Sequence, residues 1–227
     1  MKKDKAPDSL GDVGKGIQDI LSNTEKVEKI MDGSYLEEGE KKKEDKNTEE
    51  NNEEKLLDTW KEIDKRIENV HEKWNGYEVE GVKKGLTSDR ENKFEESLNF
   101  LTRSIEERKI KEIFDYGSKT MLYLGPIFEL YRDELFAEIN MIKHSVYQSY
   151  LKAMDGKEAE ATDLLKNLDE YTNKIRLKLE KDDSKIKVLE KVSLAIEDMR
   201  KSLKESSIKL HRIKMDILIK NLEELGK

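Results

Sequence analysis

The sequence predicts an all-α protein: an elongated antiparallel helical bundle with a long C-terminal helix, preceded by a disordered tether. Charged residues make up 42% of the 227 residues and hydrophobic residues only 35%, which favours long helices with narrow buried stripes. Glycine and proline are scarce, at 12 and 2 residues. Apolar residues also recur at the spacing of a helix instead of alternating as they do in a strand.

The first 54 residues are predicted to be a polar, acidic and largely disordered tether with a weak helix near residues 17–31. The first 55 residues hold 11 lysines against 16 acidic residues. Residues 32–54 are almost wholly polar, so they cannot bury enough apolar surface to offset the entropy lost on ordering. A helical bundle domain is therefore expected over residues 55–227.

Local signals divide the expected bundle into helices. A first helix is predicted from about Glu54 to Trp74, followed by a loop that contains three glycines. Ser88 begins the sequence Ser-Asp-Arg-Glu, a capping box that starts the next helix. A boundary or a kink is expected at Gly125, because a residue that precedes proline avoids the helical region. A further helix is expected from Pro126 to Met154.

The C-terminal segment is predicted to form a continuous helix from about Ser184 to Leu225. Its apolar residues follow one another in steps of three and four, as in a helix packed lengthwise in a bundle or coiled coil. The members of this stripe are Leu189, Val192, Ile196, Met199, Leu203, Leu210, Ile213 and Ile217. Ser206 occupies the one weak core position.

The sequence predicts no catalytic, cofactor-binding or metal-ligating residue, and we expect a protein that is not an enzyme. The chain has no cysteine, which excludes thiol catalysis and thiolate metal sites. Glu68 and His71 have the Glu-x-x-His spacing of carboxylate-bridged di-iron bundles. That site needs a second such motif, and the other histidines have no glutamate three positions before them.

The stretch "TMLYLGPIFELY", residues 120–131, is unusually apolar for this chain. It is too short to span a membrane, which takes about 20 apolar residues. The N-terminal residues also lack the apolar run of a signal peptide. The stretch is therefore expected to be a segment of the bundle, with a recognition surface as the alternative.

Aromatic residues around this stretch form one candidate partner surface. In the helix expected from Pro126, Phe136 and Tyr147 fall on a second apolar arc, away from the main stripe, and Tyr123 lies nearby. Aromatic side chains bury large areas at low entropic cost, which suits interface anchors. The alternative is that this helix lies centrally and packs against helices on two sides.

A basic strip on the C-terminal helix is the second candidate. Lys201, Lys204, Lys209 and Arg212 outnumber their acidic neighbours. Such a strip suits docking of an acidic protein or of a polyanion such as a glycosaminoglycan. The alternative is an ordinary solvated face. The net charge of the whole chain is −7, so nucleic acid is not expected as a partner.

Two segments carry a family resemblance: "LLDTWKEIDKRIENVHEKWNGYEVEGVKKGL" and "IFELYRDELFAEIN". Together with a cysteine-free helical domain rich in Lys, Glu, Asn and Ile behind a polar tether, they resemble the outer-surface lipoproteins of Lyme-disease spirochaetes. Within that group they look most like the leader-peptide-related branch of the outer surface protein E/F-related family. The resemblance covers the chain from about Lys55 onward.

The resemblance implies a host-interaction protein of the outer cell surface. Members of that branch bind the serine proteases of the first complement component, so we expect this chain to inhibit the classical pathway without catalysis. The resemblance also implies an N-terminal lipid anchor as the only membrane attachment, although the chain has no cysteine to carry a lipid. The alternatives are an adhesin or another host-protein binder (of fibronectin, plasminogen, factor H or a glycosaminoglycan), or a structural protein that self-associates through its heptad helix.

Overall fold

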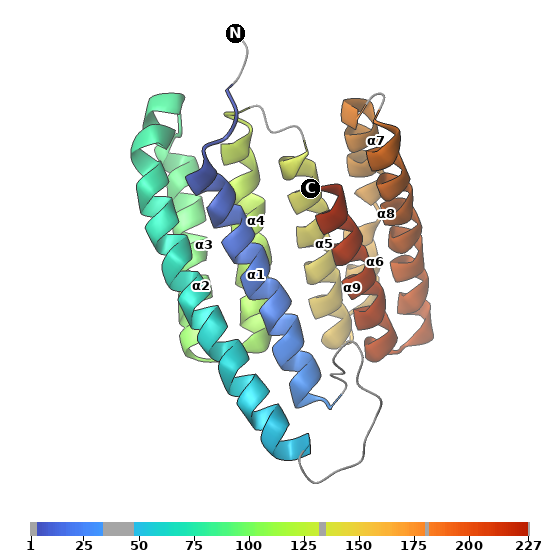
Figure 1. Ribbon diagram of the computed structural model, residues 1–227. Helices are drawn as coiled ribbons and strands as arrows, with labels where there is room; N and C mark the ends of the chain where they lie inside the picture. The colour runs from blue at the N-terminus through green and yellow to red at the C-terminus, as the bar shows by residue number, and fades with distance from the viewer. Residues whose placement is uncertain (1–3, 34–47, 132–134, 180–181, 227) are drawn as a thin grey trace.

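The computed structural model describes residues 4–33, 48–131, 135–179 and 182–226 (Figure 1). Within these ranges the chain forms helices joined by short turns and contains no strand, so the prediction of an all-α helical bundle is confirmed. The helices are α1 (Asp8–Met31), α2 (Thr48–Lys84), α3 (Ser88–Glu106), α4 (Ile110–Phe128), α5 (Phe136–Met154), α6 (Glu158–Leu165), α7 (Leu168–Leu179), α8 (Asp183–Ser202), the short 3-10 helix η1 (Leu203–Glu205) and α9 (Ile208–Leu225). None of the described helices is both long enough and apolar enough to span a membrane.

The helices form two groups that meet where α4 packs against α5. Helices α1 to α4 pack together on one side, and α5 packs with α6, α7 and α9 on the other, with α8 against α7 and α9 (Figure 1). Large aromatic side chains are buried in both groups, among them Phe94 and Phe114 in the first and Tyr147 and Tyr150 in the second. One continuous hydrophobic core therefore runs through the whole bundle.

Helix α1 is part of this core, so the prediction of a largely disordered first 54 residues is wrong for Asp8–Met31. The helix expected near residues 17–31 exists, but it begins at Asp8 and packs on α2 and α4. Its fully buried apolar side chains are Leu10, Val13, Ile17, Ile20, Leu21 and Val27. Residues 48–54, also assigned to the tether, begin α2. The middle of the predicted linker, residues 34–47, lies outside the described residues.

Close packing of α1 on α2 and α4 explains why glycines stand at its contacts. A Cβ atom added to Gly16 would lie 2.5 Å from a methyl carbon of Val70 in α2. A Cβ atom on Gly117 of α4 would lie 2.6 Å from a methyl carbon of Leu21. These glycines lower the helix propensity, but they let the helices approach one another and bury the apolar stripe of α1.

Two further helix boundaries differ from the prediction. Helix α2 continues to Lys84 through the predicted glycine loop. It does so because Tyr77 in that loop sequence is fully buried, with its ring 5.4 Å from the ring of Trp74. Helix α4 runs through Pro126 to Phe128, so no boundary lies at Gly125, and the helix expected from Pro126 to Met154 is wrong because α5 begins only at Phe136. Proline removes one backbone donor, and the next turn still forms, because the Glu129 N–H donates to the Gly125 carbonyl at 3.2 Å.

The prediction of one long C-terminal helix is wrong, because the segment folds back as the hairpin of α8 and α9. Ser206 takes the left-handed conformation, with a φ of 49°. Ser207 then caps α9, since its Oγ accepts the N–H of Leu210 at 3.2 Å. The turn also shifts the buried face of the helix. Ile213 and Ile217, both expected in the core, are each 44% exposed.

Replacing glycines of α1 tests whether this helix packs on α2. Gly16→Ala is expected to destabilise the protein by about 1–3 kcal/mol, because the added methyl group overlaps Val70. Gly11→Ala is the matched control, since a Cβ atom there meets nothing within 4 Å. The control should gain up to about 1 kcal/mol from helix propensity. Urea unfolding measures both values, and equal stabilisation by both substitutions would contradict the docking of α1.

Substitutions at the two serines distinguish the hairpin from a continuous helix. Ser207→Ala is expected to lower the free energy of unfolding by about 0.5–2 kcal/mol through loss of the cap. Ser206→Gly is expected to be neutral or stabilising, because glycine adopts a positive φ without strain. A continuous helix would reverse both signs, since alanine is a better helix former than serine and glycine a worse one. Thermal unfolding of the two variants gives the answer.

Candidate functional site

Three half-buried aromatic side chains lie along the outer side of α3 and α4. They are Phe100, Tyr116 and Tyr123, and we call this surface the aromatic face. The rings of Phe100 and Tyr116 stack with centroids 4.8 Å apart and planes 11° from parallel. Stacking holds both rings in fixed positions, with part of their surface in water.

Cationic side chains cover and border the aromatic face. The guanidinium carbon of Arg103 lies 4.4 Å from the ring centre of Phe100, and the Lys119 ammonium lies 5.2 Å from that of Tyr116. Lys119 also pairs with Asp115 at 2.7 Å, and Lys93 with Asp89 at 2.8 Å. These ion pairs lie within single helices on the surface and are weak. The cations can therefore turn toward acidic groups on a partner.

Two adjoining hollows make the aromatic face concave. One has a volume of about 220 Å³ and is lined by Phe100, Tyr116 and Tyr123. The other has a volume of about 450 Å³ and extends past Leu122 toward Met141 of α5. Lys93 and Tyr123 line both hollows. Each hollow can thus accept one side chain of a partner, with Tyr123 between the two.

The other two aromatic candidates point into the protein instead of sharing this face. Phe136 is half-buried and stacks on Phe128, with ring centroids 3.7 Å apart. Tyr147 is fully buried, and its hydroxyl donates to Glu25 Oε1 at 2.7 Å. The prediction that Tyr147 contacts a partner is therefore wrong for this conformation. Helix α5 lies centrally, with helices on two sides, which is the alternative that its wide apolar arc left open.

The basic strip is divided between the surface and the interior. Lys201, Lys204 and Lys209 are exposed at the α8–α9 hairpin. Arg212 is buried, and its Nη1 lies 2.5 Å from Asp32 Oδ2 and 3.7 Å from Glu28 Oε2. The turn at Ser206 rotates α9 and moves Arg212 off the exposed side. Arg212 is therefore not part of an exposed strip, whereas the three lysines are exposed, and their binding of a partner stays a prediction.

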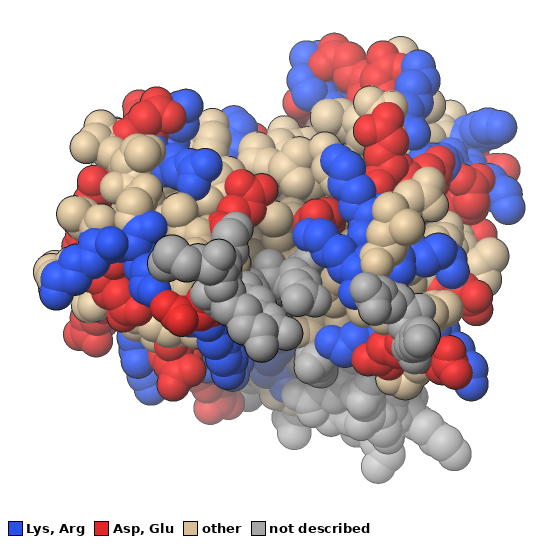
Figure 2. All heavy atoms as spheres, turned by 90° about the horizontal axis from the view of Figure 1, so that it is seen from above, with Lys and Arg blue, Asp and Glu red and all other residues tan. Residues whose placement is uncertain are grey.

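Acidic and basic groups alternate over the end of the molecule seen in Figure 2. Lysine and arginine side chains lie among aspartates and glutamates there, and neither sign forms a broad patch on this face. A polyanion such as nucleic acid is normally held by an extended basic surface. This face offers only local clusters of charge.

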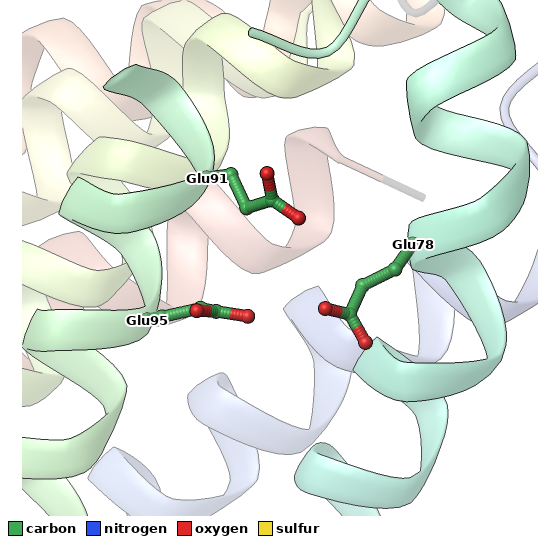
Figure 3. A group of neighbouring side chains, drawn as sticks. All are labelled: Glu78, Glu91 and Glu95. Atoms are coloured by element: carbon green, nitrogen blue, oxygen red, sulfur yellow. The ribbon is translucent and has the colours of Figure 1, made fainter. Parts of the chain in front are cut away.

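Three glutamates converge between α2 and α3: Glu78, Glu91 and Glu95 (Figure 3). Each has a carboxylate oxygen within 4.8 Å of the others, and all three residues are half-buried. Trp74 Nε1 donates to Glu95 Oε1 at 3.0 Å. Burial, together with the hydrogen bond and the charge of the neighbouring Glu95, raises the pKa of Glu78.

His71, the histidine of the Glu-x-x-His spacing, contacts a neighbouring helix. Its Nε2 lies 2.9 Å from Thr102 Oγ1, which links α2 to α3. Burial lowers the pKa of His71, against the opposing charge of Glu95. Glu68, three positions earlier, is exposed. The Glu-x-x-His spacing therefore brings no second ligand to this histidine among the described residues.

Helices α1 and α9 meet across α5 through polar and charged groups, which we call the polar seam. Its members are Gln18, Glu25, Glu28 and Lys29 of α1, Lys143, Tyr147 and Tyr150 of α5, and Arg212 and Asp216 of α9. Lys29 Nζ lies 2.5 Å from Asp216 Oδ2, and Tyr150 donates to Glu28 at 2.8 Å. Burial and the nearby Asp216 raise the pKa of Glu25 to about 8, although the hydrogen bond from Tyr147 opposes this.

Comparison with known proteins gives no further assignment: no family model, no curated protein and no solved structure matches the chain.

Phe100 of the aromatic face was not among the residues predicted from the sequence to contact a partner. Its position in the sequence could have indicated a surface role, because Phe100 falls outside the apolar stripe of α3. The buried members of that stripe are Phe94, Leu98, Leu101 and Ile105. An aromatic residue beside an otherwise regular apolar stripe indicates a surface that is packed on one side only.

Glu25→Gln tests the buried proton of the polar seam. Folded Glu25 keeps its proton up to about pH 8, whereas the unfolded residue loses it near pH 4.5. The free energy of unfolding of the native chain therefore falls over this interval relative to that of the variant, which cannot ionise. We expect the variant to gain at least about 1 kcal/mol on the native chain between pH 5.5 and pH 8.

Burial lowers the pKa values of the histidines in the fold, and they contribute equally to both proteins, so the difference between the variant and the native chain isolates Glu25. Denaturant unfolding at several pH values measures it. Glu190→Gln, at an exposed position of α8, serves as the control. A difference between Glu25→Gln and the native chain that stays constant with pH would show that Glu25 is ionised in the fold.

Proposed function

We propose that this chain is a binding protein that acts without catalysis and recognises a protein partner through the aromatic face. The observation that carries the proposal is the cluster of Phe100, Tyr116 and Tyr123 around two hollows, bordered by Arg103, Lys93 and Lys119. Tyrosine and arginine are enriched among the residues that dominate binding energies at protein interfaces. A stacked pair of rings also loses little conformational entropy on binding.

The partner we propose is a host complement serine protease of the first component, bound at the outer cell surface. Support for this partner comes from the sequence resemblance to spirochaete lipoproteins described above. The cations at the aromatic face favour an acidic surface on the partner, and electrostatic complementarity raises the association rate. In this proposal a lipid anchor holds the protein at the surface, and inhibition results from occupying the protease.

The buried ionisable groups are consistent with a role that is not catalytic. Glu25 and Glu28 accept hydrogen bonds from tyrosines of α5. Lys29 pairs with Asp216, and Arg212 with Asp32. These contacts connect one helix to another, and each group has a structural partner. The proposal therefore assigns them to holding the bundle together.

Tyr123→Ala and Tyr116→Ala are expected to weaken binding of the full chain to the protease at least tenfold each. A truncated aromatic anchor at an interface centre typically costs about 2 kcal/mol or more. The measurement is surface plasmon resonance against proenzyme and active forms at several salt concentrations, since screening weakens the contribution of the cations. Circular dichroism and thermal unfolding verify that each variant is folded.

Lys201→Ala and Lys209→Ala provide matched controls on the α8–α9 hairpin, which lies on the opposite side of the bundle from α3 (Figure 1). They should leave the affinity within about twofold, as energetically neutral positions do. Loss of binding in the lysine variants with full binding in the tyrosine variants would overturn the assignment to the aromatic face. Absence of binding by the native chain at micromolar concentration would overturn the choice of complement protease.

One feature favours the second candidate, self-association or adhesion. The outer side of the α8–α9 hairpin leaves Leu194 at 70% exposure and Ile213 and Ile217 at 44% each. Two ion pairs frame this aliphatic strip, Lys214 with Asp198 at 2.9 Å and Lys191 with Glu224 at 3.3 Å. Apolar groups within a charged rim are typical of interfaces. A concentration-dependent dimer in analytical ultracentrifugation would support this role over the first.

A further inference from the structure

A cavity of about 780 Å³ lies between α1 and α9, with α5 as its floor. This volume falls in the range of pockets that bind small molecules, about 300–1,000 Å³. The cavity shares no lining residue with the aromatic face. It therefore offers a site separate from the proposed protein interface.

One end of the cavity is apolar. Its walls there come from Leu135, Phe136 and Ile139 of α5 and Leu222 of α9. Glycines shape the α1 side, since a Cβ atom on Gly14 would lie 2.7 Å from the ring of Phe136, and one on Gly11 would meet nothing within 4 Å. The ring of Phe136 therefore packs directly against α1 at Gly14, and the open part of the apolar end lies beside Gly11.

The other end of the cavity contains a buried cation. Lys143 is only 6% exposed and lines the cavity. Its ammonium donates to Gln18 Oε1 at 2.7 Å, whereas a lysine ammonium can donate three hydrogen bonds. Burial lowers the pKa of Lys143 to about 8, although the charges of Glu223 and Glu25 oppose this. An anion placed beside the ammonium would offset the desolvation that its burial imposes.

The acidic groups near this ammonium are paired, neutral near pH 7 or closer to solvent. Glu25 accepts a hydrogen bond from Tyr147, and its pKa of about 8 keeps it mostly protonated at pH 7. Asp19 Oδ2 lies 3.5 Å from Arg66 Nη1. Glu223 lines the cavity from α9 and is half-exposed. Lys143 is thus the most deeply buried charge of the cavity, and it is positive.

We propose that this cavity binds a single-chain anionic amphiphile, a molecule with one apolar chain and a carboxylate or phosphate head. The head lies at Lys143, and the chain extends past Ile139 and Phe136 toward Leu135. The arrangement follows from the chemistry of the two ends, since a buried ammonium selects an acidic head and the aromatic and aliphatic walls select the chain. Glu223 opposes the head and limits the affinity.

The test measures binding of chemically defined amphiphiles to the full chain by isothermal titration calorimetry, below their aggregation concentrations. The probes share a sixteen-carbon chain: palmitate, palmitoyl lysophosphatidate, hexadecanol as the neutral analogue and hexadecyltrimethylammonium as the cationic one. We expect palmitate or lysophosphatidate to bind at least tenfold more tightly than hexadecanol. The tighter of the two identifies the head group as a fatty acid or a phosphate.

Two variants change the charge at the site in opposite directions. Lys143→Met keeps much of the side-chain volume and should weaken binding of the anionic probes at least tenfold, with hexadecanol unchanged. Glu223→Gln at a half-exposed position should strengthen binding of the same probes several-fold. If Lys143→Met does not fold, as judged by circular dichroism, the Glu223→Gln result decides. Absence of anion binding, no effect of either folded variant, or tighter binding of the cationic probe would each overturn the proposal.

Discussion

The central position of α5 is the constraint on which the rest of the structure depends. This helix packs against α4 on one side and against α6, α7 and α9 on the other. Its tyrosines Tyr147 and Tyr150 therefore have no access to solvent, and their hydroxyl groups need buried acceptors. Glu25 and Glu28 of α1 supply these acceptors. The position of α1 follows from these two hydrogen bonds, and α9 in turn pairs with α1 through Asp216 and Arg212.

The all-α class could be predicted because it depends on composition and periodicity, which are local properties. The ends of the helices could not, because they depend on contacts between distant residues. Tyr77 extends α2 past Gly76 and Gly81 because its ring is buried in the core, and the helix ends just before Gly85. Gly16 lowers the helix propensity of α1, and only the structure shows that Val70 occupies the space where its side chain would be. Ser206 and Ser207 form a turn although the apolar spacing continues across them.

The candidate site was predicted only in part, for a related reason. Tyr123 does lie on a concave surface, and three of the four expected cations are exposed at the hairpin. Helical periodicity shows on which side of a helix each apolar residue lies. It does not show how many other helices pack around that helix. Tyr147 was therefore expected outside although it is inside, and Arg212 was grouped with surface lysines although it pairs with Asp32. Pairing across helices is the information that a single sequence lacks.

The polar seam also determines when the fold can be completed. Tyr147 and Glu25 are 122 positions apart in the chain, and Lys143 and Gln18 are 125 apart, whereas Lys214 and Asp198 in the α8–α9 hairpin are only 16 apart. Local hairpins close quickly, and contacts between distant positions form late, because a longer loop must be closed. On the ribosome, Asp12 and Asp19 of α1 can pair with Lys73 and Arg66 of α2, whereas Glu25 and Glu28 must wait until the tyrosines of α5 have emerged. The contacts between α1 and α9 therefore form only after both helices have been synthesised, and a chain without α9 leaves Lys29 without Asp216 and Glu28 without Arg212.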